Sequence, residues 1–348
     1  MKAINALGEA SSPYLRQHAQ QPVHWQEWSE ATLAQAREQR RVIFLSIGYS
    51  TCHWCHVMAH ECFDSPAIAA VMNQHFVNIK VDREERPDID ATYMAYVMAI
   101  SGQGGWPLNL WLTPEGEPLI GGTYFPPEDR SGRAGFRRVC EEVAHLWRTE
   151  PTRLSQAAHR HLKQLREESS QPRAQHEFPG ADGIDALLRQ VIAQHDTRYG
   201  GFGHAPKFPR PCLPRFVLIC ETLQRGNAEL RQQALSATIH TLRAMMDGGL
   251  HDHLGGGFHR YAVDSRWHIP HFEKMLYDQA QLAELYLDAW NIQLGDASEN
   301  ARYLRTVERL FAYVASELRH PDGGFYAAED ADSQIDHNLP QRREGAYW

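Results

Sequence analysis

The stretch Arg41–His60, RVIFLSIGYSTCHWCHVMAH, decides the fold of the first half of the chain. It begins with an apolar run, Val42–Ile47, which predicts a buried strand. The run breaks at Gly48–Thr51, and the sequence CHWC (52–55) then stands where a helix is expected to start. Free N–H groups and the dipole at a helix N-terminus favour a thiolate on the first of the two cysteines. The second cysteine lies one turn further on, close enough to form a disulfide with the first.

A buried strand that leads into a CxxC helix is typical of the thioredoxin fold, and the rest of the first 150 residues agrees with that assignment. Residues 1–25 are predicted to be irregular. The expected order after them is helix, strand, CxxC helix, second helix, strand, helix, strand hairpin and helix. These elements are expected at Glu27–Arg40, Val42–Ile47, Cys52–Cys62, a helix from Pro66, Phe76–Val81, Ile89–Ser101, Leu108–Thr113 with Pro118–Ile120, and Phe136–Trp147.

Two cysteines and one proline are predicted to carry the redox chemistry of this fold. We expect Cys52 to be the exposed nucleophile and Cys55 to be the more buried resolving thiol. Pro107 directly precedes a predicted strand, and in a thioredoxin fold a proline at this place has a cis peptide bond and packs beside the disulfide. The nearby His53 and His56 stabilise a thiolate further when they are protonated. We expect no cofactor beyond the Cys52–Cys55 disulfide, no metal, and a protein thiol or disulfide or a small thiol as partner.

Other interpretations of the same motif stay open at this point. CxxCH (52–56) is the haem-attachment pattern, but covalent attachment needs export, and the N-terminus has no apolar signal region. Cys52, Cys55, His56 and His60 fit a zinc site, although a second, distant pair of ligands is more usual. The cysteines are also compatible with a purely structural role. The remaining cysteines are scattered and are expected to be buried reduced thiols: Cys62, Cys140, Cys212 and Cys220.

Length and charge limit the classes of function. At 348 residues the chain is long enough for two domains. Its net charge of −8, without a long basic run, argues against a nucleic-acid partner. No apolar run approaches the roughly 20 residues that a membrane-spanning helix needs, so no membrane partner is expected. Because no secretory signal is visible either, we expect a cytoplasmic protein.

The second half predicts a different, all-helical architecture. We expect a thioredoxin-like domain at 1–150, a helix and linker at 151–180, and a helical domain at 181–348, with linker composition at Ser169–Gly180. No convincing strands are predicted beyond the linker, and the helix at 272–290 is apolar nearly all round, which predicts an inner helix. Helices are expected at Leu154–Glu168, Asp182–His195, Cys212–Gln224, Glu229–Met246, Phe272–Trp290 and Asn300–Arg319.

The connections between these helices alternate in length. Long loops at 196–211, 248–271 and 320–343 each carry Gly-Gly-Phe, whereas the connections near 226 and 293 are short. This alternation predicts stacked helical hairpins whose long loops gather at one mouth. Stacked hairpins of this kind form an α/α toroid, which closes with six hairpins. Only about three are present, so we expect a truncated product or a half-ring that another copy or chain completes.

Long motifs along the whole chain resemble one known family. They are Ser12–Leu15, Pro22–Trp25, Ile47–Met58, Val81–Asp90, Gly104–Pro107, Gly121–Pro126, Gly203–Pro209, Asp252–Tyr261, Pro270–Ala280 and Ala328–Ser333. The chain resembles the thioredoxin-domain family that includes the spermatogenesis-associated thioredoxin-like protein and its bacterial relatives. The resemblance implies a thioredoxin-like domain followed by a six-hairpin α/α toroid similar to those of sugar epimerases and glycoside hydrolases. It also implies a usual length greater than that of this chain.

A second set of candidate site residues gathers around the long loops. Toroids that act on sugars use aromatic platforms with carboxylates or histidines as acid and base, so a sugar is a candidate ligand. Two carboxylates two residues apart, Asp330 and Asp332, are able to raise one another's pKa. Helix capping and hydrogen bonding in Gly-rich loops account for such residues equally well. The candidates are His251, His253, His259, His271, Asp278, Asp330 and Asp332.

We therefore expect a thiol–disulfide oxidoreductase-like protein fused to a carbohydrate-enzyme-like toroid. One alternative is a sugar epimerase, isomerase or glycoside hydrolase whose thioredoxin domain is structural or regulatory. The other is a non-enzymatic binding scaffold.

Overall fold

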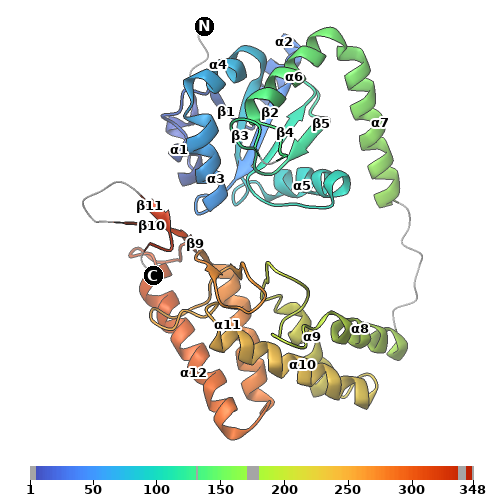
Figure 1. Cartoon of the computed structure of the whole chain (residues 1–348), viewed down its shortest axis with the longest axis vertical. Coiled ribbons are helices and arrows are strands. Elements are labelled where there is room, and N and C mark those ends of the chain that lie inside the picture. The colour runs from blue at the N-terminus through green and yellow to red at the C-terminus, as the bar shows by residue number, and fades with distance from the viewer. Residues whose placement is uncertain (1–4, 131, 171–179, 336–341, 347–348) are drawn as a thin grey trace. The chain divides into compact units, whose positions relative to one another are not determined.

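A computed structural model of the chain describes residues 5–130, 132–170, 180–335 and 342–346. The chain divides into two compact units, Met1–Pro172 and Arg173–Trp348, and each is described by itself (Figure 1). Most of the linker predicted at Ser169–Gly180 falls at 171–179, outside the described residues.

The first unit is built on a five-stranded mixed sheet. Its strands are β1 (Trp25–Glu27), β2 (Ile43–Gly48), β3 (Val77–Asp82), β4 (Leu108–Leu112) and β5 (Pro118–Gly122), in the order β1-β3-β2-β4-β5. Neighbours among β1, β3 and β2 are parallel, whereas β4 is antiparallel to β2 and to β5. β2 and β3 are buried along their whole length, as central strands covered on both faces should be.

Helices cover both faces of this sheet (Figure 1). Ile43, Leu45 and Ile47 of β2 enter a core shared with α2 and α5 on one face. On the opposite face Phe136 of α6 meets Phe44 at a centroid distance of 5.2 Å. The helices of the unit are α1 (Pro13–Gln17), α2 (Glu30–Gln39), α3 (His53–Met58), α4 (Pro66–His75), α5 (Pro87–Ser101), α6 (Phe136–Thr149) and α7 (Pro151–Ser170). This is the predicted thioredoxin-like α/β fold.

Residues 5–25 contain regular elements, contrary to the prediction that residues 1–25 are irregular: α1 lies among them and β1 begins at Trp25. Trp25–Glu27 pairs with β3 as an edge strand because the buried Trp25 ring packs 5.1 Å from that of Phe63. The helix predicted from Glu27 therefore begins only at Glu30, where the Ser29 side chain caps it. The helix predicted to run to Cys62 changes at Ala59 into a π-helical turn, Ala59–Phe63.

The second unit consists of helical hairpins, as predicted. Its helices are α8 (Ala181–Gln194), α9 (Cys212–Thr222), α10 (Ala228–Asp247), α11 (Leu276–Asn291) and α12 (Ala297–Tyr313), which a π-helical turn, Val314–Leu318, continues. The helix expected from Phe272 begins four residues later, because Lys274–Met275 forms a short strand. One side of α11, including Gln281 and Glu284, is exposed, so this helix is not buried all round.

Strands do occur in the second unit, contrary to the prediction, but each has only two or three residues. Segments this short show no alternation in the sequence from which a strand could be predicted. They join the long loops, since Lys207 bridges Ala262 and Lys274–Met275 pairs with Ala328–Glu329. The three loops therefore lie together, as the repeat predicts. The strands are β6 (Tyr261–Ala262), β7 (Pro270–His271), β8 (Lys274–Met275), β9 (Ala328–Glu329), β10 (Asp332–Gln334) and β11 (Arg342–Glu344).

A buried lysine holds each of the first two Gly-Gly-Phe turns. In the first turn, Lys207 Nζ donates to Asp196 Oδ2 over 2.5 Å and to the Gly200 carbonyl over 2.6 Å. The side chains of Lys207 and of Lys274, which has the same role in the second turn, are each only 1% exposed. The second turn repeats the arrangement at 2.7 and 3.0 Å with Lys274, Asp252 and Gly256.

The third Gly-Gly-Phe turn is open. Phe325 is 54% exposed, whereas Phe202 and Phe258 of the other two turns are buried.

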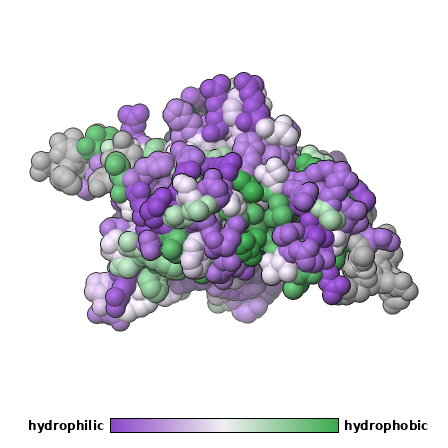
Figure 2. Space-filling view, turned by 90° about the horizontal axis from the view of Figure 1, so that it is seen from below, coloured by the Kyte–Doolittle hydropathy of each residue, from purple (hydrophilic) through white to green (hydrophobic). Residues whose placement is uncertain are grey.

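No helix among the described residues is both long and apolar enough to cross a bilayer. Figure 2 shows hydrophobic residues in patches within a mostly hydrophilic surface.

Candidate functional site

Cys52 and Cys55 form a disulfide at the start of α3. Cys52 is the N-cap residue, and its sulfur accepts a 3.2 Å hydrogen bond from the backbone N–H of Cys55. That N–H and the helix dipole stabilise a thiolate on Cys52 once the disulfide is reduced. The Trp106–Pro107 bond is cis, as predicted, and the next residue, Leu108, pairs with Ile47 of β2. Pro107 therefore stands beside the strand that leads into the CxxC motif.

The expectation of an exposed Cys52 is wrong for the oxidised chain. Cys52 is 3% exposed and Cys55 is 1% exposed, and their sulfurs are joined in the disulfide. While the disulfide is closed, neither sulfur is a thiolate. The zinc interpretation, with His56 and His60 as further ligands, needs thiolates from both residues, so it applies only to the reduced chain.

In the second unit, His271 is held between two carboxylates. Its Nδ1 lies 2.5 Å from Glu344 Oε1, and its Nε2 lies 3.7 Å from Glu273 Oε2. Burial lowers the pKa of the imidazole, but the two carboxylates outweigh that effect and raise the pKa to about 9. The Tyr261 ring stacks on His271 at a centroid distance of 4.8 Å. His271 is therefore a positively charged, aromatic-lined group at neutral pH.

His259 has the opposite character. It is 2% exposed, and its Nδ1 lies 3.1 Å from the Phe272 carbonyl. Burial, followed by the positive charge of Lys274, lowers the pKa of His259 to about 4. Nearby, Arg260 donates to Asp278 over 2.6 Å, and burial raises the pKa of that carboxyl. A neutral imidazole and an imidazolium thus occur in one region of the unit.

The other candidate histidines make hydrogen bonds within the loops. His251 Nδ1 lies 3.2 Å from the Met246 carbonyl, and His253 Nε2 lies 3.0 Å from the Gly248 carbonyl. Burial, with His253 next, lowers the pKa of His251 to about 4. These contacts are typical of structural residues.

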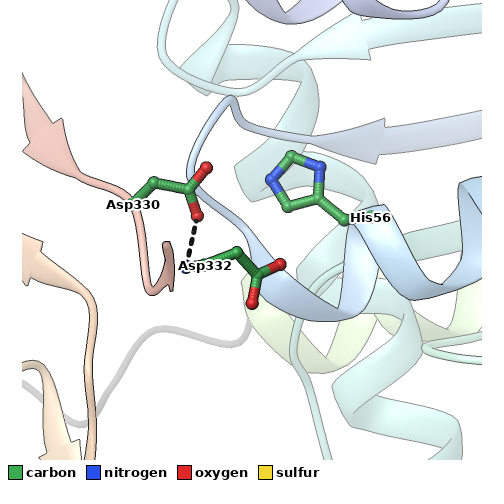
Figure 3. A group of neighbouring side chains, drawn as sticks. All are labelled: His56, Asp330 and Asp332. Carbon is green, nitrogen blue, oxygen red and sulfur yellow. Dashed lines mark hydrogen bonds between the residues drawn. The ribbon is translucent and has the colours of Figure 1, made fainter. Parts of the chain in front are cut away.

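Asp330 and Asp332 belong to one turn. The Asp332 amide donates to Asp330 Oδ1 over 2.9 Å, as Figure 3 shows. Arg342 donates to the other oxygen of Asp330 over 3.2 Å. Both oxygens of Asp330 thus accept hydrogen bonds from within the second unit, which is an arrangement that orders a loop.

Sequence comparisons agree with this two-unit description. The family model described as "Thioredox_DsbH: Protein of unknown function, DUF255" matches residues 4–166. An uncharacterized protein of Caenorhabditis elegans is 44% identical over 99% of this chain, and human spermatogenesis-associated protein 20 is 43% identical over 99% of it. Over nearly its whole length the chain is therefore similar to spermatogenesis-associated protein 20 and its relatives. It spans 46% and 43% of the length of these two relatives, which is less than half.

Solved structures also resemble parts of the chain. A DsbH oxidoreductase is 18% identical, with a TM-score of 0.27, over 36% of this chain and 86% of its own. The cellobiose 2-epimerase from Spirochaeta thermophila is 20% identical, with a TM-score of 0.34, over 49% of this chain and 40% of its own.

Aromatic residues near the disulfide escaped the sequence prediction of the site. Trp106 Nε1 donates to the buried Asp90 over 2.8 Å, and the Arg83 guanidinium lies 4.1 Å from the Trp106 ring centroid. Trp54 is 47% exposed and packs 5.1 Å from Tyr124. The sequence did carry a signal for this cluster. The charged residues Arg83 and Asp90 lie on either side of a segment that reads as a solvent-exposed loop in the sequence.

Proposed function

We propose that the thioredoxin-like unit carries out thiol–disulfide exchange through Cys52 and Cys55. The reduced Cys52 thiolate attacks one sulfur of a partner disulfide, a mixed disulfide forms, and the first partner thiolate leaves. Cys55 then gives up its proton and attacks the Cys52 sulfur. The second partner thiolate leaves and takes up that proton. Two electrons pass to the partner, and the Cys52–Cys55 disulfide remains.

The observation that carries this proposal is the backbone N–H of Cys55 directed at the Cys52 sulfur over 3.2 Å. A donor in this place lowers the pKa of the attacking thiol and so makes it a better nucleophile at neutral pH. The exposed Trp54 next to the pair offers an apolar surface to a partner chain. Pro107 would shape the place where that chain approaches. A protein disulfide is thus the favoured partner, and a small thiol would regenerate the reduced form.

The test is a titration of the full chain in glutathione redox buffers, with free thiols counted by alkylation and mass spectrometry. We expect one reversible disulfide, lost in both Cys52→Ser and Cys55→Ser. Cys55→Ser should accumulate a mixed disulfide with a peptide substrate, and Cys52→Ser should not. Cys62→Ser is the matched control, because burial raises the pKa of this free thiol to about 12. A wild-type chain without a reversible disulfide and without insulin reduction would contradict the proposal.

A second candidate function lies in the second unit, where His271 and His259 have pKa values displaced in opposite directions. Neighbouring groups of this kind supply the acid and the base of a proton transfer. With the aromatic ring of Tyr261 beside His271, a sugar isomerisation or epimerisation is the reaction that fits. A monosaccharide and disaccharide screen should detect turnover that His259→Gln and His271→Gln abolish and His253→Ala retains. Blank screens at every substrate would reject this second function and leave the first untouched.

A further inference from the structure

The hydroxyl of Tyr14 is buried without a hydrogen-bond partner. Tyr14 lies in α1 and is 0% exposed. Among the described residues, no group accepts from or donates to its hydroxyl oxygen. Removing a hydroxyl from water without such a partner costs folding free energy, and native proteins seldom retain one without a reason.

Gly48 shows what this hydroxyl faces. A Cβ atom built on Gly48 would lie 2.3 Å from the Tyr14 hydroxyl oxygen and 2.7 Å from Cys55 Sγ. Both atoms therefore border one small space, and they are no further apart than the sum of these two distances. Gly48 ends β2, and any larger residue there would fill the space between them. Gly48 thus leaves the space between the hydroxyl and the resolving sulfur open.

The wall behind this space is polar, although it is buried. Lys80 of β3 is 1% exposed and donates to Ser46 Oγ of β2 over 3.1 Å. Its ammonium nitrogen lies 5.4 Å from the centroid of the Tyr14 ring. Burial, followed by the negative charge of Asp82, raises the pKa of Tyr14 well above its usual value. The hydroxyl therefore keeps its proton and is available as a donor.

We propose that Tyr14 is a positioning residue for the resolving thiol, whose hydroxyl donates a hydrogen bond to the Cys55 sulfur once the disulfide is open, first to the thiol of the reduced chain and then to the thiolate of the resolving step. A disulfide sulfur is a weak acceptor and a thiolate is a strong one, so the hydroxyl, which is unpaired in the oxidised state, gains its strongest acceptor when Cys55 loses its proton. The inference rests on the proposed thiol–disulfide exchange. In the resolving step, Cys55 attacks the Cys52 sulfur, the partner thiolate leaves with the proton that Cys55 released, and Tyr14 keeps its own proton throughout.

Tyr14→Phe tests the inference because it removes one oxygen and keeps the ring. We expect the resolving step, followed by acid quench and mass spectrometry of the mixed disulfide, to slow about tenfold, as loss of a hydrogen bond to a charged group implies. In the reduced chain the hydroxyl bonds the Cys55 thiol, a weaker acceptor than the thiolate, so the reduction potential of the pair should become more negative by less than the roughly 30 mV that a tenfold change implies. The rate of the first attack by Cys52 should not change.

Tyr93→Phe is the matched control, since its hydroxyl donates over 2.9 Å to the Gly116 carbonyl on the other face of the sheet. It should lower the thermal stability of the oxidised chain and leave the redox values unchanged. Tyr14→Phe should instead shift the redox values and leave the thermal stability of the oxidised chain unchanged, because the Tyr14 hydroxyl has no hydrogen bond to lose in that state. A second variant, Gly48→Ala, places a methyl group in the same space and should shift the potential in the same direction as Tyr14→Phe.

Suppose that the wild-type chain exchanges disulfides and that Tyr14→Phe and Gly48→Ala have the same redox values as the wild-type chain. This result would overturn the role of Tyr14 and leave the proposed exchange in place. A loss of oxidised-state stability in Tyr14→Phe as large as that in Tyr93→Phe would overturn the role of Tyr14 too. A wild-type chain that forms no reversible disulfide would instead remove the proposed exchange, and the role of Tyr14 with it.

Discussion

Replacing Lys274 by methionine should destabilise the second unit strongly. The lysine is 1% exposed and its ion-pair partner Asp252 is 2% exposed, with 2.7 Å between Nζ and Oδ2. Methionine keeps most of the volume but leaves the carboxylate buried without its counter-charge. Breaking a buried pair in this way costs about 3–5 kcal/mol. The Gly256 carbonyl loses its donor as well.

The first repeat provides the matched control. Lys207 is equally buried, but its partner Asp196 is 21% exposed, so water solvates that carboxylate when the lysine is removed. Lys207→Met should therefore cost less, about 1–3 kcal/mol, which is the range for a hydrogen-bonding group left without its partner. Asp252→Asn combined with Lys274→Met removes both charges of the second pair and should recover part of the loss.

Hydrogen exchange of amides in α11 and α12 of the full chain measures the opening free energy of this unit separately from the first. We expect Lys274→Met to destabilise the unit most. The double variant should cost less than Lys274→Met, and Lys207→Met should cost the least or about as much as the double variant. If Lys207→Met cost as much as Lys274→Met, burial of the carboxylate would not be the quantity that decides the cost, and the reasoning would be refuted.

Two further predictions concern the second unit. The pKa of His271 is raised to about 9 in the folded state, so its stabilising contribution is complete below its unfolded value of about 6.5 and is lost as the pH rises through 9. Hydrogen exchange between pH 6.5 and 9 should reveal a loss of about 3 kcal/mol that His271→Gln lacks, and an identical profile in both chains would count against it. Phe258→Ala should cost about 3–5 kcal/mol because the ring is fully buried, whereas Phe325→Ala, at an exposed ring, should change stability by less than about 0.5 kcal/mol. Equal thermal shifts in these two variants would show that the third turn is packed like the second.

The sequence predicted the elements whose signals are local. The apolar run 43–47 and the CxxC motif placed a strand and a helix start, and spacing placed Pro107 beside them. Gly-Gly-Phe repeats predicted that the long loops lie together. Each of these inferences needed only a short stretch of chain or a fixed period.

What the sequence missed depends on distant pairs. Lys274 and Asp252 are 22 residues apart and His271 and Glu344 are 73 apart, and no periodic pattern connects them. Lysine is also the residue type least expected inside a protein. Tyr14 was overlooked for a similar reason, since it comes from a segment without a clear pattern and lies near Cys55 only in the folded chain.

The third Gly-Gly-Phe turn distinguishes the role of the glycines from the role of the buried lysines. Its backbone closes like the first two, with the His320 amide donating to the Gly324 carbonyl. His320 also stands where the other turns have aspartate: its Nδ1 accepts from the amide two residues on, over 3.0 Å, as Asp252 Oδ1 does over 2.8 Å. An imidazole replaces the carboxylate as acceptor but cannot attract a lysine in the same way, and among the described residues no heavy atom lies within 4 Å of a Cβ built on Gly323 or Gly324. The glycines therefore shape the turn, and the lysine–aspartate pair accompanies its burial.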